Sequence, residues 1–444
     1  MNLVTLRDVG VAYDGYEALQ HVDLEIADND FLGVIGPNGG GKTTLVKAIL
    51  GTVPHTGEVR LAPELFRDKE RLIGYMPQLS DFDRTFPISV LEVVLSGLQG
   101  HKGIFSRYTK ADRAKALDLL ETAGVADTAR NPIGEVSGGQ MQRALLCRAV
   151  ISDPKLLILD EVHLLASDRG NVVESITART LRQIESTQTP IRLVGLSATL
   201  PNYTDVAEFL HVNAEPGKGL FYCDDSFRPV PLTQRFLGIT ITNKLKAIEK
   251  QYELAYDRCM AELLQGKQAM VFVHSRKDTM VTAKKLLDYA TEGRRSDLFG
   301  SPHDHERYEY FKARVQRSKN AQLQQLFEHS LAIHHAGMRR SDRNLVEEMF
   351  AAGVVKVLCC TSTLAWGVNL PAHGVIIKGT ELYDAARGGW VDVDILDVIQ
   401  IFGRAGRPQF DTSGEGCIIG LHDHIDNFAR LMVMKVGVTV GREA

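Results

Sequence analysis

The sequence lacks long apolar segments and has few cysteines, and each shortage excludes a class of protein. No apolar run approaches the roughly 18 residues that span a bilayer. The N-terminal region carries Asp8, Asp14 and Glu17 where a secretory signal would be apolar. The six cysteines show no CxxC spacing, and two of them, Cys359 and Cys360, are adjacent. This pattern indicates buried thiols in a reducing cytosol rather than a zinc site or a disulfide framework.

The excess of one sign of charge over the other is also small. The formal net charge is −4 over 444 residues, so the chain as a whole is not a polybasic nucleic-acid binder, and any such surface must be local. Hydrophobic residues make up 44% and charged residues 24%, as in ordinary globular proteins. At about 150 residues per domain, the length predicts two to three domains. We expect a cytoplasmic protein with no membrane segment of its own.

The first part of the chain alternates between apolar strands and segments with helical spacing. An apolar strand over 24–36 runs into a helix that begins near Lys42. Apolar residues at helical spacing predict a helical insert around 105–130. Two further apolar runs, 156–160 and 191–199, are typical of buried parallel strands.

The same alternation restarts at about Arg228. It predicts a long helix over 243–265 and another from Asp278, and the polar stretch 291–326 is either a surface helix pair or a mobile insert. The predicted strands of this part are QAMVFVHS, VVKVLCC and GVIIKGT. The pattern predicts an α/β fold with a second parallel-sheet domain.

A glycine-rich stretch follows the first of these strands. It matches G-x-x-x-x-G-K-[ST] and consists of Gly36, Pro37, Asn38, Gly39, Gly40, Gly41, Lys42 and Thr43. Glycines allow backbone N–H groups to turn inward around a phosphate, and the following helix N-terminus favours an anion. In such a loop Lys42 reaches the β- and γ-phosphates and the Thr43 hydroxyl ligates Mg²⁺. Thr44, the next residue, is assigned to the same nucleotide site.

Two carboxylates end the strand over 156–160. Asp160 is placed to hold Mg²⁺ through water, and Glu161 to polarise the attacking water. Coupled with the phosphate loop, the pair predicts an ATP or GTP hydrolase.

Residues 1–161 resemble the ATP-binding subunits of ABC transporters. The signature of that family is matched by EVSGGQ, with Val136 where leucine is usual. Its assigned residues are Ser137, Gly138, Gly139 and Gln140. The resemblance implies that Gln78 senses the nucleotide, that Tyr13 stacks on adenine, and that the signature works only in a head-to-tail dimer. The run FPISVLEVVLSG is most similar to metal importers of the family.

After Glu161 the chain departs from that family and resembles superfamily-two DExH helicases of the superkiller and large spliceosomal type. Residues 160–163 read Asp-Glu-Val-His, the box that names those helicases, and the likeness extends to about residue 432. Further helicase motifs are SAT (197–199), VFVHSR (271–276), HHAGM (334–338), TSTLAWGVNLP (361–371) and QIFGRAGRP (400–408).

The helicase resemblance implies a set of functional residues. They are His163 and Gln400 in catalysis, Arg404 and Arg407 as arginines that stabilise the transferring phosphoryl group, Gly367 at the nucleotide, Ser197, Ala198 and Thr199 in coupling, and Ser275, Arg276 and Thr363 on nucleic acid.

Both resemblances are incomplete, which predicts a chimera arising by gene-model error, recombination or design. The D-loop and switch histidine of an ABC subunit are missing, and ABC-like sequence stands where a helicase has its own first strand motifs. We predict a hybrid first domain over 1–227, with a helical insert at about 85–145. In it, 1–161 is ABC-like and 162–227 helicase-like. A second domain follows over 228–432, and a tail over 433–444.

The expected fold is therefore an α/β P-loop NTPase with two RecA-like parallel-sheet domains. The expected function is a helicase-like, nucleic-acid-dependent ATPase using ATP and Mg²⁺, a monomer acting on single-stranded nucleic acid, with RNA preferred to DNA. The location is the cytoplasm, or the nucleus if it follows the helicase parent. The alternatives are an ABC-type subunit serving a transmembrane permease, and a chimera that only binds nucleotide.

Overall fold

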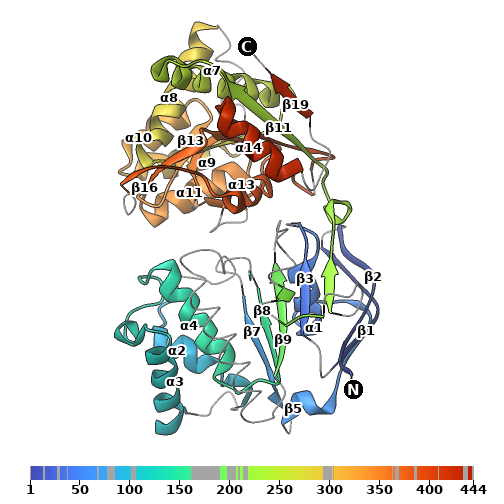
Figure 1. Ribbon diagram of the computed structural model, residues 1–444. Helices are drawn as coiled ribbons and strands as arrows, with labels where there is room; N and C mark the ends of the chain where they lie inside the picture. The colour runs from blue at the N-terminus through green and yellow to red at the C-terminus, as the bar shows by residue number, and fades with distance from the viewer. Residues whose placement is uncertain are drawn as a thin grey trace. The chain divides into compact units, whose positions relative to one another are not determined.

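The computed structural model describes two compact units, Met1–Arg228 and Pro229–Ala444 (Figure 1). The described residues are 2–13, 16–27, 31–37, 39–67, 70–77, 86–101, 107–160, 162, 191–197, 207–208, 211–213, 219–293, 303, 305–362, 364–365, 370–384, 388–408, 410–433 and 439–442.

Unit 1 begins with an antiparallel sheet. Its strands, in sheet order, are β2 (Tyr16–Ala27), β1 (Asn2–Tyr13) and β4 (Thr56–Leu61). Apolar residues of β1 such as Val4, Leu6 and Val9 are fully buried, and they belong to the same core as β3 and its helix. A short pair, β5 (Phe66–Arg67) and β6 (Glu70–Arg71), follows the 3-10 turn Pro63–Leu65.

The centre of unit 1 is a five-stranded parallel sheet. Its order is β10 (Leu220–Tyr222), β3 (Leu32–Ile35), β9 (Arg192–Ser197), β8 (Leu156–Leu159) and β7 (Ile73–Met76). Every residue of β3, β9 and β8 is buried, as expected for central parallel strands. The order places the strands that end at Gly36, Ser197 and Asp160 side by side, so their carboxyl ends meet at one edge.

Helices form the predicted insert. They are α2 (Val90–Ser96), α3 (Lys110–Thr122) and α4 (Gly138–Val150), with short 3-10 turns at Gln99–His101 and Ala126–Thr128. Each helix starts at a capping box. The side chain of Ser89, Thr109 or Ser137 accepts the backbone N–H of the third helical residue, and the side chain of that residue accepts the backbone N–H of the cap. Their apolar faces form a separate small core. These helices lie where the sequence predicts an insert in the α/β fold.

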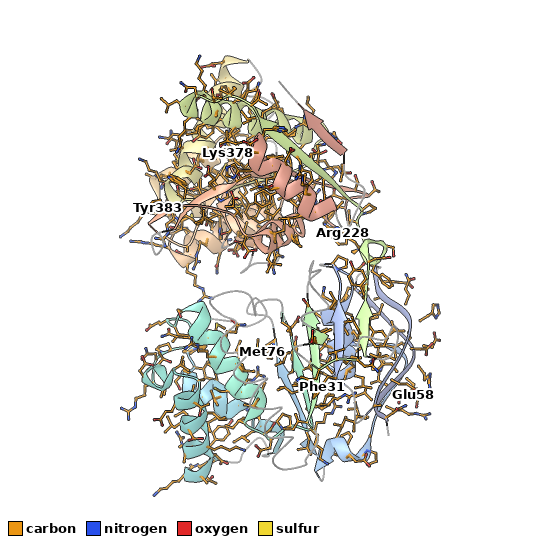
Figure 2. All side chains as sticks on the ribbon, viewed as in Figure 1. Phe31, Glu58, Met76, Arg228, Lys378 and Tyr383 are labelled. Carbon is orange, nitrogen blue, oxygen red and sulfur yellow. The ribbon has the colours of Figure 1, made fainter. Side chains whose placement is uncertain are left out.

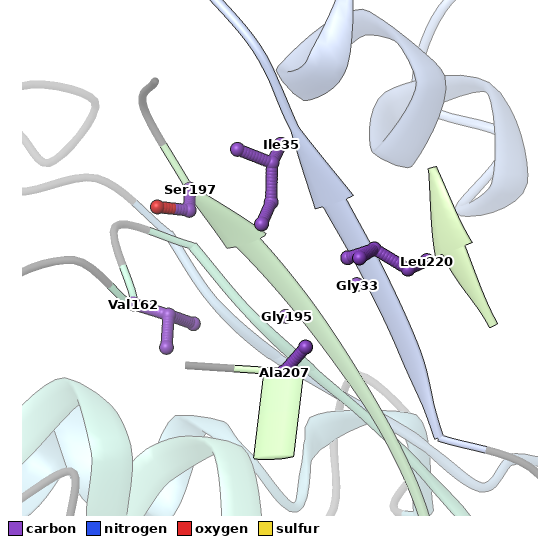
Figure 3. A pocket seen from close by; sticks show the side chains of 7 residues that line it. All are labelled: Gly33, Ile35, Val162, Gly195, Ser197, Ala207 and Leu220. Carbon is purple, nitrogen blue, oxygen red and sulfur yellow. The ribbon is translucent and has the colours of Figure 1, made fainter. Parts of the chain in front are cut away.

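A small cavity lies in the core where the two kinds of sequence meet. Figure 3 shows its lining, which comprises Gly33, Ile35, Val162, Gly195, Ser197, Ala207 and Leu220. Its volume is about 10 Å³, room for about one water molecule. The first two residues belong to the ABC-like segment and the others to the helicase-like segment. The cavity therefore lies where residues of the two segments meet.

Unit 2 is built on a seven-stranded parallel sheet. The order is β13 (Leu331–His334), β14 (Val357–Thr361), β12 (Ala269–Val273), β15 (Gly374–Lys378), β18 (Gly414–Leu421), β11 (Leu232–Ile239) and β19 (Thr439–Arg442). An antiparallel hairpin of β16 (Glu381–Asp384) and β17 (Gly389–Asp392) projects from it. The second parallel-sheet domain is confirmed. Residues 439–442, inside the predicted tail, pair with β11.

The helices of unit 2 connect these parallel strands. They are α7 (Lys244–Leu263), α8 (Arg276–Glu292), α9 (Tyr308–Arg317), α10 (Ala321–Phe327), α11 (Arg340–Ala351), α13 (Ile395–Phe402) and α14 (His422–Val433). A 3-10 turn at Asp225–Phe227 precedes them, at the end of unit 1. The polar stretch 291–326 contains α9 and α10, so its described part is the helix pair. The helix expected from Asp278 begins at Arg276, because Ser275 caps it by accepting the backbone N–H of Asp278.

In the part of the chain that the structure describes, no helix combines the length and apolar character needed to cross a membrane. All six cysteines have free thiols, five of them buried and Cys223 half-buried.

Candidate functional site

The phosphate loop of unit 1 has a backbone that requires glycine. Gly39 and Gly41 have φ of 85° and 80°, in the left-handed region that other residues rarely adopt. A Cβ added at Gly41 would lie 2.7 Å from the carbonyl oxygen of Ala18 and 2.8 Å from Cδ2 of Leu19. The loop therefore has the glycine-dependent backbone that the sequence pattern predicts, and Ala18 and Leu19 of β2 lie against it at Gly41.

Lys42 folds back over this loop. Its Nζ donates to the carbonyl oxygens of Gly36 at 2.7 Å and Pro37 at 2.8 Å. It stands at the first position of α1 (Lys42–Ile49), and Gly41 at the N-cap makes no side-chain cap bond. The ammonium group and the helix N-terminus together form a positive concavity suited to phosphates.

Thr43 and Asp160 meet at the sheet edge. The Thr43 hydroxyl donates to Oδ2 of Asp160 at 3.3 Å, although 117 residues separate them. Asp160 follows β8 and is only 2% exposed. The neighbouring strand β9 holds the start of the phosphate loop, because the Gly36 N–H donates to the Ser197 carbonyl oxygen at 3.2 Å.

These residues fit an ATP·Mg²⁺ complex. A hydroxyl oxygen and a carboxylate in contact are the hard ligands that Mg²⁺ prefers, and the loop glycines leave a cradle without Cβ atoms. Thr43 and Asp160 would hold the ion, and Lys42 would exchange its two carbonyl partners for phosphate oxygens.

The predicted signature opens α4. The Ser137 hydroxyl accepts the N–H of Gln140 at 3.2 Å, and the Gln140 side chain accepts the N–H of Ser137 at 2.9 Å. Ser137 is exposed, and a Cβ at Gly139 would meet nothing within 4 Å. Val136 is buried in the helical core, where a shorter side chain replaces the usual leucine. Tyr13 ends β1 and is 38% exposed.

In unit 2, Ser275 and Arg276 stand where β12 passes into α8. A buried network fixes this turn. Asp278, in the first turn of α8, accepts the Tyr252 hydroxyl at 3.0 Å and pairs with Lys378 at 3.0 Å. Lys378 lies inside the unit (Figure 2) and its Nζ is 4.1 Å from the centre of the Tyr252 ring.

The two predicted catalytic arginines already have partners within unit 2. Arg404 donates to the carbonyl oxygen of Ala365, and Gln400 is buried in α13. Arg407 donates Nε to Asp411 at 2.8 Å and Nη1 to Gln268 at 2.6 Å. Their role at a nucleotide stays a prediction.

Several predicted residues lie outside the described part of the chain: Asn38, Gln78, Glu161, His163, Ala198, Thr199, Thr363 and Gly367.

The structure brings to these motifs two residues that no sequence pattern indicates, Cys223 and Asp411. Cys223 follows β10, donates its N–H to the Ile35 carbonyl at 2.7 Å, and leaves no room for a Cβ at Gly36. Burial raises the pKa of its thiol, although Lys42 opposes this. Asp411 is the buried partner of Arg407 and Lys267. A cysteine or aspartate without a motif gives no sequence signal.

Two different family models match two separate parts of the chain. Residues 19–163 match the family model "ABC transporter", and residues 298–409 match "Helicase conserved C-terminal domain". The chain is part ABC-like and part helicase-like.

Two relatives match this chain over nearly all of its own length. The DExH-box ATP-dependent RNA helicase DExH14 of Arabidopsis thaliana is 43% identical over 440 residues, 96% of this chain and 19% of the relative. Activating signal cointegrator 1 complex subunit 3 of Homo sapiens is 43% identical over 446 residues, 97% of this chain and 19% of the relative. The chain thus spans about a fifth of the length of these relatives.

Two of the solved structures similar to this chain are described as ABC proteins. A metal-chelate type ABC transporter is 28% identical with a TM-score of 0.36, over 45% of this chain and 74% of that one. A bacterial ABC transporter cassette is 23% identical with a TM-score of 0.39, over 50% of this chain and 94% of that one.

Proposed function

We propose that this chain is an ATP-hydrolysing P-loop protein whose activity depends on single-stranded nucleic acid, as in a helicase. The observation that carries the ATPase part is the contact between Thr43 and Asp160 beside the folded-back Lys42. The nucleic-acid part is supported by the match of residues 298–409 to a helicase domain and by relatives named as RNA helicases.

The proposal assigns roles to the two parts of the chain. Residues 1–227 bind ATP, and Thr43 and Asp160 hold Mg²⁺, whose charge would offset that of the phosphates. Residues 228–432 bind the sugar-phosphate backbone around Ser275 and Arg276, which carries no base specificity. We further propose RNA over DNA as the natural strand, a monomer, and a cytoplasmic or nuclear location.

Steady-state ATPase activity with and without single-stranded RNA tests the proposal. We expect RNA to raise the rate several-fold, and Lys42→Ala to abolish both the rate and the rise in melting temperature that millimolar ATP produces. Lys47→Ala, a lysine in the last turn of the same helix, is the matched control and should keep both. A chain whose melting temperature does not respond to ATP would contradict the nucleotide site.

The runner-up function is an ABC-type subunit that powers a transmembrane permease. The exposed, capped start of α4 at Ser137 favours it, because that signature acts on a nucleotide only from a second subunit. ATP hydrolysis that does not respond to RNA and rises with the square of the protein concentration would support this function. Nucleotide binding without hydrolysis would leave only the third alternative, a chimera that binds nucleotide.

A further inference from the structure

A lysine is buried at the carboxyl end of β15, beside the start of α8. Lys378 ends β15 and is 5% exposed, and its Nζ pairs with Oδ2 of Asp278 at 3.0 Å (Figure 2). The same Nζ lies 4.1 Å from the centre of the Tyr252 ring. The lysine therefore contacts α8 through a carboxylate and α7 through an aromatic face.

Asp278 joins the same three elements from the side of α8. Its Oδ1 accepts the hydroxyl of Tyr252 at 3.0 Å and that of Thr282 at 3.4 Å. We call Tyr252, Asp278 and Lys378 the α8 clamp, because together they hold the first turn of α8 to both α7 and β15.

The segment before the clamp is held to β15 as well. His274 follows β12, and its Nε2 bonds to the carbonyl oxygen of Gly379, directly after β15, at 2.8 Å. A carbonyl oxygen can only accept, so Nε2 carries the proton, and burial lowers the pKa of His274 so that the ring is neutral near pH 7. The chain is therefore tied to the end of β15 at His274 and again at Asp278. These two points flank Ser275 and Arg276.

The ion pair of the clamp contributes direction more than stability. Burying an ammonium group removes its water, and the attraction of one carboxylate does little more than offset that cost. An apolar side chain of similar volume would pack equally well. The charged pair instead admits one arrangement, in which the ammonium lies both beside the Asp278 carboxylate and over the Tyr252 ring.

We propose that Lys378 is a positioning residue, which through Asp278 keeps the turn of Ser275 and Arg276 in the arrangement that binds a nucleic-acid strand. This inference rests on the proposed function, and it adds to that function residues that do not touch the strand themselves. The Ser275 hydroxyl accepts the N–H of Asp278 at 3.1 Å, so α8 uses its lone pair and leaves its proton for a ligand. Without the clamp only a fraction of chains has this turn formed, and the apparent affinity falls by that fraction.

Amide hydrogen exchange of the full chain tests the clamp without any ligand. Lys378→Met keeps an apolar side chain against the Tyr252 ring and leaves Asp278 its two hydroxyl donors. We expect amide protection factors in the first turn of α8, including that of Asp278, to fall about tenfold, while those of β12 stay unchanged. The double variant Lys378→Met with Asp278→Asn removes both charges and makes the same test if the single variant unfolds.

The matched control is a second lysine that joins the same two helices. Lys285 of α8 pairs with Glu249 of α7 at 2.8 Å, but on the exposed face of the unit. Lys285→Met should keep wild-type protection in both α8 and β12, because exposed ion pairs contribute little.

Stimulation of ATPase activity by a single-stranded oligouridylate tests the role of the clamp in binding. In Lys378→Met we expect the half-saturating concentration of the oligonucleotide to rise about fivefold, with the maximal rate and the KM for ATP unchanged. A merely structural defect would lower the maximal rate instead, because unfolded chains do not hydrolyse ATP. Lys285→Met should match wild type in all three quantities.

Several results would overturn the proposal. They are wild-type protection of α8 in both clamp variants, a wild-type half-saturating concentration in a variant that has lost this protection, and unfolding of both variants, which would make the clamp a requirement of the fold. A wild-type chain whose ATPase activity ignores the oligouridylate would overturn the proposed function and the positioning role with it. A wild type that responds, with variants that respond equally, would overturn the positioning role alone.

Discussion

One close constraint on the phosphate loop involves two small residues, Gly36 and Cys223. A Cβ at Gly36 would lie 2.7 Å from the Cβ of Cys223, closer than such atoms approach in proteins. Gly36 ends the strand that the ABC-like segment supplies, whereas Cys223 belongs to the helicase-like segment. Gly36 and Cys223 thus lie against each other at one of the places where the two segments of the hybrid domain meet, beside the pairing of β3 with β9 and β10.

This contact predicts a compensating pair of substitutions. Gly36→Ala should displace the loop and abolish the rise in melting temperature with ATP, because a Cβ cannot fit beside Cys223. Adding Cys223→Gly removes the opposing Cβ and should restore part of the rise, measured by thermal unfolding at millimolar ATP. Equal loss in the single and double variants would show that the contact does not limit the loop.

A second residue-scale feature is the buried carboxylate of Asp411. Burial alone would raise its pKa, but bonds from Arg407 and Lys267 outweigh this and lower the pKa to about 2, from an ordinary 3.8. A carboxyl group with a lowered pKa stabilises the fold above its unfolded pKa, and that stabilisation is lost as pH falls from 3.8 towards 2.

Acid unfolding of an Asp411→Asn variant tests this role. The variant should be less stable than wild type at pH 7, and its loss of stability between pH 4 and 2 should be smaller by about 2 kcal/mol. Urea titrations at each pH measure both quantities. A variant with the same acid dependence as wild type would exclude Asp411 as the titrating group.

The partners of Arg407 affect how its variants are interpreted. Replacing it by alanine would leave Asp411 buried beside Lys267 alone, and removing one member of a buried pair costs about 3–5 kcal/mol. Lost activity in Arg407→Ala therefore does not by itself identify a phosphoryl-stabilising arginine.

At the scale of elements, the central strands of unit 1 pack imperfectly. Ile35 of β3 lines the cavity at the junction and is 2% exposed. Its truncation would enlarge an existing void, because two other lining residues, Gly33 on β3 and Gly195 on β9, have no side chains with which to fill the space (Figure 3).

Ile35→Ala should therefore lower the free energy of unfolding of unit 1 by about 2–5 kcal/mol. Leu117→Ala on α3 removes a side chain that is 42% exposed and should cost well under that amount. Urea unfolding followed by circular dichroism compares them. Equal, small losses would indicate that the hybrid core is already loosely packed.

At the scale of the whole molecule, the two candidate functions differ in how many chains they need. A helicase-like ATPase acts as one chain, whereas the ABC signature acts only on the nucleotide of a second copy. We expect hydrolysis to be first order in protein and Ser137→Ala to change the rate by less than about twofold, since the proposed function gives that hydroxyl only its capping role. Initial rates over a range of protein concentration measure this. A second-order rate that Ser137→Ala abolishes would favour the transporter function.

The two units can unfold separately, because each has its own core. The chain divides between Arg228 and Pro229, and each unit has its own sheet and core. Unfolding curves should therefore be fitted without assuming a single transition.

The sequence by itself determined the local chemistry of this protein. The loop from Gly36 to Thr43, the strands that end at Asp160 and Ser197, and the second series of strands follow from residue patterns that act over a few positions. Glycine spacing and apolar runs are local constraints, so they can be read without a fold.

Only the tertiary structure decided which distant residues meet. It placed β9 between β3 and β8, brought Thr43 to Asp160, and set Cys223 against Gly36. It also gave Arg407 a buried carboxylate partner in Asp411. These pairings depend on strand order and side-chain volume, which are properties of the assembled core rather than of any segment of the sequence.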